Sequence, residues 1–346
     1  MTRVYLIGLP GQIGGASTEA WHAVRLWRVL GCQVTVIPTW YDDPLWRRKL
    51  EAIGIRVLAL EKPECLRTLS ELRGAVVVGI CSGAFLQYAP WLKAAGAKLV
   101  WIGCMNAVWG NEKTFFHAHG PFDAYVYQSQ FQYAVVTREL RAIGVPMDRF
   151  VRIPGSFTCD EFPYRPRTHM PGDPFVVGRL ARPDPDKWHV DTWATYAAIP
   201  YRPIQAAMMG WTGAIERKLG VPPDWAMTLM PCGETTPEFL ARLHCLFPIN
   251  GPFTENWPQV GLEAMATGVP IVAQRAGGWP EMVEHGVTGF LSESLAELAD
   301  LANVLAEDDS LRGAMARRAH ERLLDELANP NQMAEQWQTL FDRISN

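Results

Sequence analysis

Two glutamates in the second half of the chain have a spacing that suits recognition of hydroxyl groups. Glu255 and Glu263 are separated by seven residues, and Pro258 between them is well placed to open a helix. Glu255 then lies in the loop before that helix and Glu263 about a turn and a half inside it, so both carboxylates can face one cleft. A nucleotide sugar offers matching hydroxyls on its transferred sugar and its ribose. Taken alone, such a pair is usually two solvated surface charges.

The residues that follow the glutamates extend the pattern. Glu263 opens the run EAMATGVPIV, and Gly277 and Gly278 are followed by Trp, Pro and Glu281. The segment resembles the signature of retaining glycosyltransferases of the GT-B fold, family 4 type (glycosyl transferases group 1). That signature has Glu, seven residues and Glu, followed by E-A-M-A-x-G-x-P-V-V and then G-G-x-x-E. The resemblance implies that the chain transfers a sugar.

Two upstream segments share this resemblance. GRL at 178–180 and the later Lys187 are similar to the family's G-R-L and following Lys, which grip the donor diphosphate. The segment IPGSFTCDEF at 153–162 is similar to the family's interdomain segment. The second half of the chain therefore carries most of the resemblance, and the first half carries it loosely, through its glycine pair and its strand order.

The resemblance also implies roles for individual residues. Glu255 would orient the donor sugar through its hydroxyls, and Arg179 and Lys187 would stabilise the negative charge that grows on the diphosphate as the sugar leaves. The sugar would be delivered with retention, and the departing phosphate itself can take the acceptor proton. The implied donor-binding residues are Gly14, Gly15, Val260, Glu263, Gly277 and Gly278.

Many relatives carry a histidine directly after the strand that here reads KLVWIG, but this chain continues with Cys104. His117 and His119, in the nearby run FFHAHGPF, are the candidates to replace that catalytic histidine. A structural role for either is the alternative.

The glycines after the first strand fall at 8, 11, 14 and 15, which is not G-x-G-x-x-G, so a nicotinamide dinucleotide site is not indicated. Small residues ahead of a helix leave backbone N–H groups open to an anion, although a tight turn alone would also explain them. We expect no metal and no cofactor, because two cations and a helix terminus can do the work of a magnesium ion. Asp184 and Asp186 form the nearest D-x-D set. The co-substrate would be a UDP- or GDP-linked sugar.

The acceptor side is predicted in the first half of the chain, where basic residues lie among aromatic ones. Arg47, Arg48 and Lys49 follow Trp46, with Trp40 and Tyr41 just before. Such a cluster suits an anionic lipid surface, a phosphorylated sugar or a modified nucleic-acid base, and a solvated helix face over core aromatics is the alternative.

The two halves of the chain differ in the sign of their net charge. Residues 1–155 hold 17 Lys and Arg against 11 Asp and Glu, whereas residues 156–346 hold 15 against 25. The halves would then meet different partners, unless the difference is only drift in surface composition. Seven scattered cysteines without a C-x-x-C pair indicate neither a disulfide framework nor a zinc site, and they fit a reducing cytoplasm. We expect no transmembrane segment and a cytoplasmic protein, with peripheral membrane contact as an option.

Short apolar runs alternate with helical patterns along the whole chain, which predicts parallel sheets with crossover helices. The fold class is therefore α/β, with two Rossmann-like doubly wound parallel-sheet domains, and the resemblance implies that these domains face a cleft, as in the GT-B fold. Residues 1–155 would form the acceptor-side domain, 156–330 the nucleotide-sugar domain, and 331–346 a helix that packs back toward the first domain. The predicted strands are 3–8, 33–38, 55–60, 74–80, 98–103, 124–128, 150–154, 174–180, 201–209, 225–231, 245–249, 270–274 and 289–291.

Other functions remain open at this point. A nucleotide-sugar epimerase shares the architecture but lacks paired glutamates at this spacing. A non-catalytic nucleotide-sugar-binding protein of the same fold would leave nearly the same sequence pattern. A sugar phosphorylase would need a pyridoxal lysine and usually a much longer chain.

Overall fold

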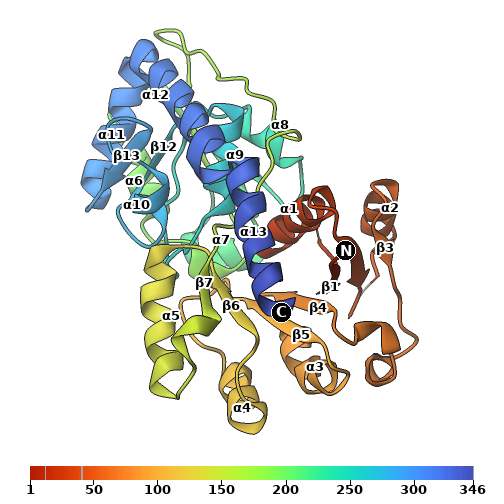
Figure 1. Ribbon diagram of the computed structural model, residues 1–346. Coiled ribbons are helices and arrows are strands. Elements are labelled where there is room, and N and C mark those ends of the chain that lie inside the picture. Colours follow the sequence, from red (N-terminus) through yellow and green to blue (C-terminus); the bar gives the residue numbers. More distant parts are fainter. Residues whose placement is uncertain (12, 40–41, 346) are drawn as a thin grey trace. The chain divides into compact units, whose positions relative to one another are not determined.

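The structure is a computed structural model, and it describes residues 1–11, 13–39 and 42–345. The chain divides into two compact units (Figure 1). The first unit consists of Met1–Phe157 and Pro330–Asn346, and the second consists of Thr158–Asn329.

The first unit is built on a parallel sheet whose strands are runs of buried, mostly β-branched residues. The strand order is β3-β2-β1-β4-β5-β6-β7, in which the chain starts in the middle and reverses direction once, as in Rossmann folds. The strands are β1 (Arg3–Ile7), β2 (Gln33–Ile37), β3 (Arg56–Val57), β4 (Val76–Ile80), β5 (Lys98–Ile102), β6 (Ala124–Tyr127) and β7 (Phe150–Arg152).

Helices connect these strands and return the chain to the same edge of the sheet each time. They are α1 (Gly15–Val29), α2 (Pro44–Ala52), α3 (Gly83–Ala94), α4 (Gly110–His119) and α5 (Gln130–Ala142), with the last helix of the chain, α13 (Pro330–Ser345), in the same unit. Because every described strand pairing in the sheet is parallel, the loops that follow the strands gather at one edge.

The second unit repeats the plan with the order β10-β9-β8-β11-β12-β13, again all parallel in the described residues. The strands are β8 (Phe175–Leu180), β9 (Ile204–Met209), β10 (Ala226–Leu229), β11 (Cys245–Leu246), β12 (Ile271–Gln274) and β13 (Gly289–Ser292). The helices are α6 (Thr192–Ala197), α7 (Gly213–Leu219), α8 (Thr236–Leu240), α9 (Gln259–Thr267), α10 (Trp279–Met282), α11 (Leu295–Glu307) and α12 (Asp309–Arg322). The prediction of two Rossmann-like parallel-sheet units is confirmed.

Two predicted strands are shorter than their apolar runs. The run at 55–60 pairs only over Arg56–Val57, because β3 is an edge strand that bonds to β2 alone. The run at 245–249 contains Pro248, which has no N–H to donate to a neighbouring strand, and the strand ends at Leu246.

The first helix begins at the glycine pair. α1 starts at Gly15, so Ser17 and Thr18, which are residue types that often cap helices, lie inside its first turn. Gly14 is the N-cap, and its φ of 99° lies in the region that favours glycine. No helix in the described part of the chain is both long and apolar enough to cross a membrane.

The last helix is attached to the first unit through aromatic rings. Trp337 on α13 packs against Trp27 on α1, with ring centroids 5.1 Å apart in an edge-to-face arrangement, and it also contacts Phe341. Both tryptophans are fully buried. Aromatic packing of this kind adds to the free energy gained by removing the rings from water.

We expect Trp337→Ala to lower the free energy of unfolding by about 3–5 kcal/mol, because it leaves a large cavity between α1 and α13. Urea denaturation followed by circular dichroism measures this loss. Gln338→Ala, which removes a surface hydrogen bond to Asp342 on the same helix, serves as the control. An equal loss in both variants would show that the helix contributes only its own helicity.

Candidate functional site

Two predicted site residues of the second unit lie in loops that follow its strands. Lys187 ends a short 3₁₀ turn (Pro185–Lys187) after β8, and Glu255 lies in the loop between β11 and α9. Their side chains meet, with Lys187 Nζ 2.6 Å from Glu255 Oε1. The Lys187 ammonium also lies 4.0 Å from the ring centre of Phe253. Two residues that are 68 positions apart in the chain are thus joined.

Burial lowers the pKa of Lys187, and the Glu255 carboxylate opposes that shift by stabilising the ammonium. The exposed side chain of Arg182, on the loop after β8, is a further cation near Lys187 and lowers the pKa again. Sequence reasoning missed Arg182. Its position three residues after Arg179, on a loop at the carboxyl end of a strand, was the available signal.

Arg179 on β8 is buried, and its guanidinium is bonded within the protein. Its terminal nitrogens donate to the backbone carbonyls of Ile249 and Lys187, the latter at 2.7 Å. The guanidinium also stacks on the Trp188 ring, 4.5 Å from its centre. Arg179 therefore holds the backbone of Lys187 in place from behind.

Glu263 is in the middle of α9, and Pro258 is the N-cap of that helix, as the sequence predicted. The side chain is buried, and burial raises the pKa of Glu263 to about 7. This carboxyl group therefore changes its charge close to neutral pH. Val260, the second residue of α9, is half-buried.

Gly277 and Gly278 pack directly against the loop that carries Glu255. A Cβ atom at Gly277 would lie 2.1 Å from the carbonyl oxygen of Glu255, and one at Gly278 would lie 1.7 Å from that of Asn256. The Gly278 N–H donates to the Glu255 carbonyl at 2.8 Å. The glycine pair thus fixes the loop by close backbone contact, which explains why side chains are absent there.

In the first unit, Gly14 and Gly15 lie at the amino end of α1, which follows β1. The first N–H groups of a helix have no partner inside it, and they point toward the positive end of the helix dipole. The position therefore fits the expected contact with an anion.

His117 and His119 lie elsewhere. Both are exposed in the last turn of α4, which begins after the carboxyl end of β5 and runs back toward the amino end of β6. Asp123, four residues after His119, bonds through its backbone to Leu99 near the start of β5. The two histidines are therefore near the amino edge of the first sheet, away from the loops where ligands of parallel sheets bind.

The basic cluster of the first unit is mostly engaged within the protein. Arg47 forms ion pairs with Asp42 and Glu51. The Lys49 ammonium lies over the rings of Trp21 and Trp46, at 4.3 and 4.7 Å from their centres.

Arg48 is exposed and donates to the Pro44 carbonyl. Trp40 and Tyr41, which the sequence places beside this cluster, lie outside the described residues.

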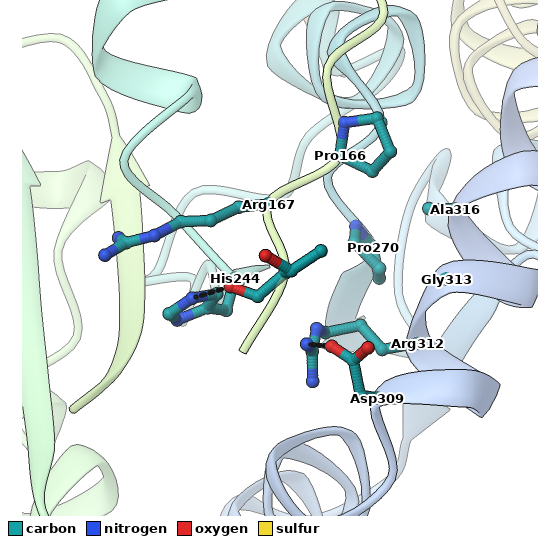
Figure 2. Close-up of a pocket in the computed structure, with 10 residues that line it drawn as sticks. Pro166, Arg167, His244, Pro270, Asp309, Arg312, Gly313 and Ala316 are labelled. Atoms are coloured by element: carbon teal, nitrogen blue, oxygen red, sulfur yellow. Dashed lines mark hydrogen bonds and ion pairs between the residues drawn. The ribbon is translucent and has the colours of Figure 1, made fainter. Parts of the chain in front are cut away.

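Figure 2 shows a small pocket in the second unit, with a volume of about 90 Å³. It is lined by Pro166, Arg167, Thr168, His244, Gly268, Pro270, Asp309, Arg312, Gly313 and Ala316. His244 and Pro270 directly precede β11 and β12, so the pocket lies at the amino edge of the sheet. None of the predicted donor residues lines it, and it is smaller than the roughly 300–1,000 Å³ of typical ligand sites.

The polar groups of this pocket are already paired. His244 accepts a hydrogen bond from the Val176 N–H and donates one to the Thr168 carbonyl. Burial, together with Arg167 and Arg312, lowers the pKa of His244 to about 3, so the ring is neutral. Arg312 bonds to Asp309 and to the Leu305 carbonyl.

Comparison with curated proteins finds relatives over short segments. N-acetyl-alpha-D-glucosaminyl L-malate synthase of Bacillus anthracis is 37% identical over 89 residues, which cover 25% of this chain and 23% of that protein. D-inositol 3-phosphate glycosyltransferase of Pseudarthrobacter chlorophenolicus is 38% identical over 88 residues, or 25% and 21% of the two chains. The matches thus span less than a quarter of these relatives.

Comparison with solved structures extends over nearly the whole chain. Anabaena HepE in complex with UDP-glucose superposes with a TM-score of 0.76 at 18% identity, covering 98% of this chain and 100% of that one. Sucrose-phosphate synthase from Thermosynechococcus elongatus gives 0.74 at 16% identity, covering 99% of each chain. At these identities the likeness shows the fold, which is that of GT-B glycosyltransferases.

A family model described as "Glycosyl transferases group 1" matches residues 175–308. This range begins at β8 and ends after α11, so it contains Arg179, Lys187, Glu255, Glu263 and the glycine pair. The second unit of this chain carries a domain of the glycosyl transferases group 1 family.

Proposed function

We propose that this protein is a retaining glycosyltransferase that moves a sugar from a nucleoside-diphosphate sugar to an acceptor hydroxyl. The observation that carries the proposal is the contact between Lys187 and Glu255 inside the matched domain. Buried Glu263 lies on α9, the helix that follows the Glu255 loop. A cation for the diphosphate and a carboxylate for the sugar are thereby held together on two loops at the carboxyl ends of the strands.

Lys187 supplies the positive charge for the leaving group. As the bond between the anomeric carbon and the diphosphate breaks, negative charge grows on the phosphate oxygens, and a fixed ammonium stabilises that charge more than it stabilises the intact donor. Exposed Arg182 adds a second cation, and Arg179 positions the Lys187 backbone through its hydrogen bond. This arrangement does not require a metal ion or a cofactor.

Glu255 exchanges partners when the donor binds. In the structure its carboxylate is bonded to Lys187, and the diphosphate would compete for that ammonium. Glu255 would then accept hydrogen bonds from the donor sugar, and Glu263 from the ribose. The sugar is transferred with retention, and the departing phosphate takes the proton of the acceptor hydroxyl on the same face.

We propose an anionic acceptor and a UDP- or GDP-linked donor. The names of both curated relatives contain a small anionic compound, L-malate in one and D-inositol 3-phosphate in the other. HepE was solved with UDP-glucose. Since Arg47 is paired with acids and Lys49 lies over tryptophan rings, exposed Arg48 is the member of the basic cluster best able to meet such an acceptor.

The proposal is tested by substituting each of the two glutamates in turn and comparing the effects on ligand binding. Glu263→Ala should weaken binding of the bare nucleoside diphosphate, because that ligand retains the ribose. Glu255→Ala should not weaken that binding, because the diphosphate no longer competes with a carboxylate for Lys187, but it should weaken binding of the whole sugar donor. Calorimetric titration with UDP and UDP-glucose, or their GDP counterparts, measures both, and equal losses for both ligands in both variants would refute the division of roles.

The raised pKa of Glu263 predicts a pH dependence of nucleotide binding. The ionised carboxylate accepts stronger hydrogen bonds than the neutral acid, and with a pKa of about 7 it forms between pH 6 and 8. Affinity for the nucleoside diphosphate should therefore rise over this range in the native protein relative to Glu263→Gln. Titration calorimetry of both proteins at each pH cancels the ionisation of the nucleotide itself, and a constant ratio of affinities would contradict the assignment.

A further inference from the structure

A buried acid in the first unit has no part in the chemistry proposed above. Glu19, in the second turn of α1, is only 3% exposed. Its Oε2 atom accepts a hydrogen bond from the Gln128 side-chain amide and one from the Cys104 thiol at 3.8 Å. The Cys81 thiol also acts on Cys104, and it is the largest of the influences that raise the pKa of Cys104. A carboxyl group is thus enclosed by two thiols and an amide.

These partners come from the carboxyl ends of three neighbouring strands. Cys81 directly follows β4, Cys104 follows β5 by two residues, and Gln128 directly follows β6. Cys81 has a φ of 45°, a left-handed conformation that is uncommon outside glycine, and its N–H bonds to the Ile102 carbonyl at 2.9 Å. Glu19 therefore joins α1 to the edge of the sheet at which ligands of such folds bind.

The loop between β5 and α4, residues 103–109, is held by side chains along its length. Glu19 bonds to Cys104 near its start. The Gln132 amide donates to the carbonyls of Gly103 at 2.7 Å and Met105 at 3.0 Å. At the other end, the Trp109 N–H donates to buried Glu112 at 3.0 Å. The loop has no regular secondary structure, so these bonds determine its shape.

We infer that Glu19 is a positioning residue that holds the 103–109 loop in the shape that receives the acceptor. The inference rests on the proposed function, in which the first unit binds the acceptor. This loop contains Cys104, which stands at the position where many relatives carry a histidine. Glu19 contacts Cys104 from helix α1. Glu19 acts on the acceptor through the loop and does not touch it.

The strength with which Glu19 holds the 103–109 loop depends on pH. Burial, followed by the influence of Cys81, raises the pKa of Glu19 to about 8, and the Cys104 hydrogen bond opposes the shift. The folded, closed loop therefore favours the neutral acid, while an open loop would expose Glu19 to water at its ordinary pKa. By linkage, the open form gains about tenfold per pH unit between the two pKa values, and the gain stops above about pH 8.

The effect of Glu19 on the loop can be distinguished from the effects of neighbouring ionisable groups. Among the described residues, the groups that act on Glu19 are the thiols of Cys81 and Cys104, and the pKa of Cys104 is well above its usual value, so that thiol stays neutral in this range. Glu112 is a second buried acid, and burial, with smaller contributions from Cys81 and Glu139, raises its pKa to about 7. Both acids must therefore be varied.

The test compares the native protein with Glu19→Gln and Glu112→Gln, each of which keeps the size and a carbonyl oxygen of the original side chain. Hydrogen–deuterium exchange of the peptide that contains 103–109 is measured from pH 5 to 9. The opening constant of the native protein should grow about tenfold per pH unit up to about pH 8, relative to Glu19→Gln. A ratio that does not change with pH, or one abolished by Glu112→Gln instead, would overturn the inference.

Activity provides the second readout on the same three proteins. The KM for the acceptor should rise with pH in the native protein and stay level in Glu19→Gln, while the KM for the donor behaves alike in both. Identical acceptor profiles would remove the positioning role. If no sugar is transferred by any variant while the exchange ratio behaves as expected, the proposed function fails and the role of Glu19 in holding the loop stands.

Discussion

Lys187→Ala should lower kcat roughly a hundredfold, because it removes the ammonium that stabilises the departing diphosphate, a contribution of about 3 kcal/mol to the barrier. The side chain bonds directly to Glu255, so the substitution also frees that carboxylate. Folding should change little, since the Lys187 backbone remains held by Arg179. Turnover at saturating donor, measured as release of nucleoside diphosphate, gives the effect.

Two further variants show whether the lost charge is responsible. Lys187→Arg restores a cation and should recover part of the activity, although its planar group has a different shape. Lys218→Ala removes another lysine that bonds to the same turn, through the Pro185 carbonyl at 2.5 Å. In this variant Glu255 keeps its ion pair with Lys187. Near-normal turnover by Lys187→Ala, or an equal loss in Lys218→Ala, would mean that Lys187 has no role in the chemistry.

Gly278→Ala should weaken donor binding about a hundredfold, because the new Cβ would lie 1.7 Å from the Asn256 carbonyl oxygen and backbone must move to accommodate it. That backbone continues into Glu255, so the carboxylate shifts from its position, and misplacement by about 1 Å can cost a factor of 100. The free energy of unfolding should fall by about 1–3 kcal/mol as well.

Gly313→Ala is the matched control for this substitution. Gly313 lies in the middle of α12, and a Cβ there would meet nothing within 4 Å. Alanine in a helix interior should stabilise the protein by about 0.5–1 kcal/mol and leave donor binding unchanged. Donor calorimetry and urea denaturation distinguish the two variants, and unchanged binding by Gly278→Ala would show that the glycine pair does not position Glu255.

The fold was predictable from the sequence because each buried strand is a short apolar run bounded by turn residues. Strand lengths were less predictable. The run at 55–60 looks like any other strand, but its place at the sheet edge leaves only Arg56–Val57 paired. Pairing depends on neighbours that are distant in sequence, so the run alone carries no information about it.

The candidate site was predictable where a motif fixed the spacing, as for Glu255 and Glu263. The contact between Lys187 and Glu255 was not, because it joins two loops whose separation depends on the whole sheet. The burial of Arg179 was equally unpredictable, because the sequence does not show that its guanidinium bonds to backbone carbonyls. His117 and His119 illustrate the converse, because closeness in sequence placed them near the site and the direction of α4 carries them away.

The central claim is that the second unit binds a nucleoside-diphosphate sugar through Lys187, Glu255 and Glu263. Thermal unfolding of the native protein with a panel of nucleotide sugars tests it most directly. A ligand present at 100 times its Kd should stabilise the protein by about 2.7 kcal/mol, so at least one UDP- or GDP-linked sugar should raise Tm clearly. An unchanged Tm with every nucleotide sugar and every nucleoside diphosphate at millimolar concentration would contradict the claim.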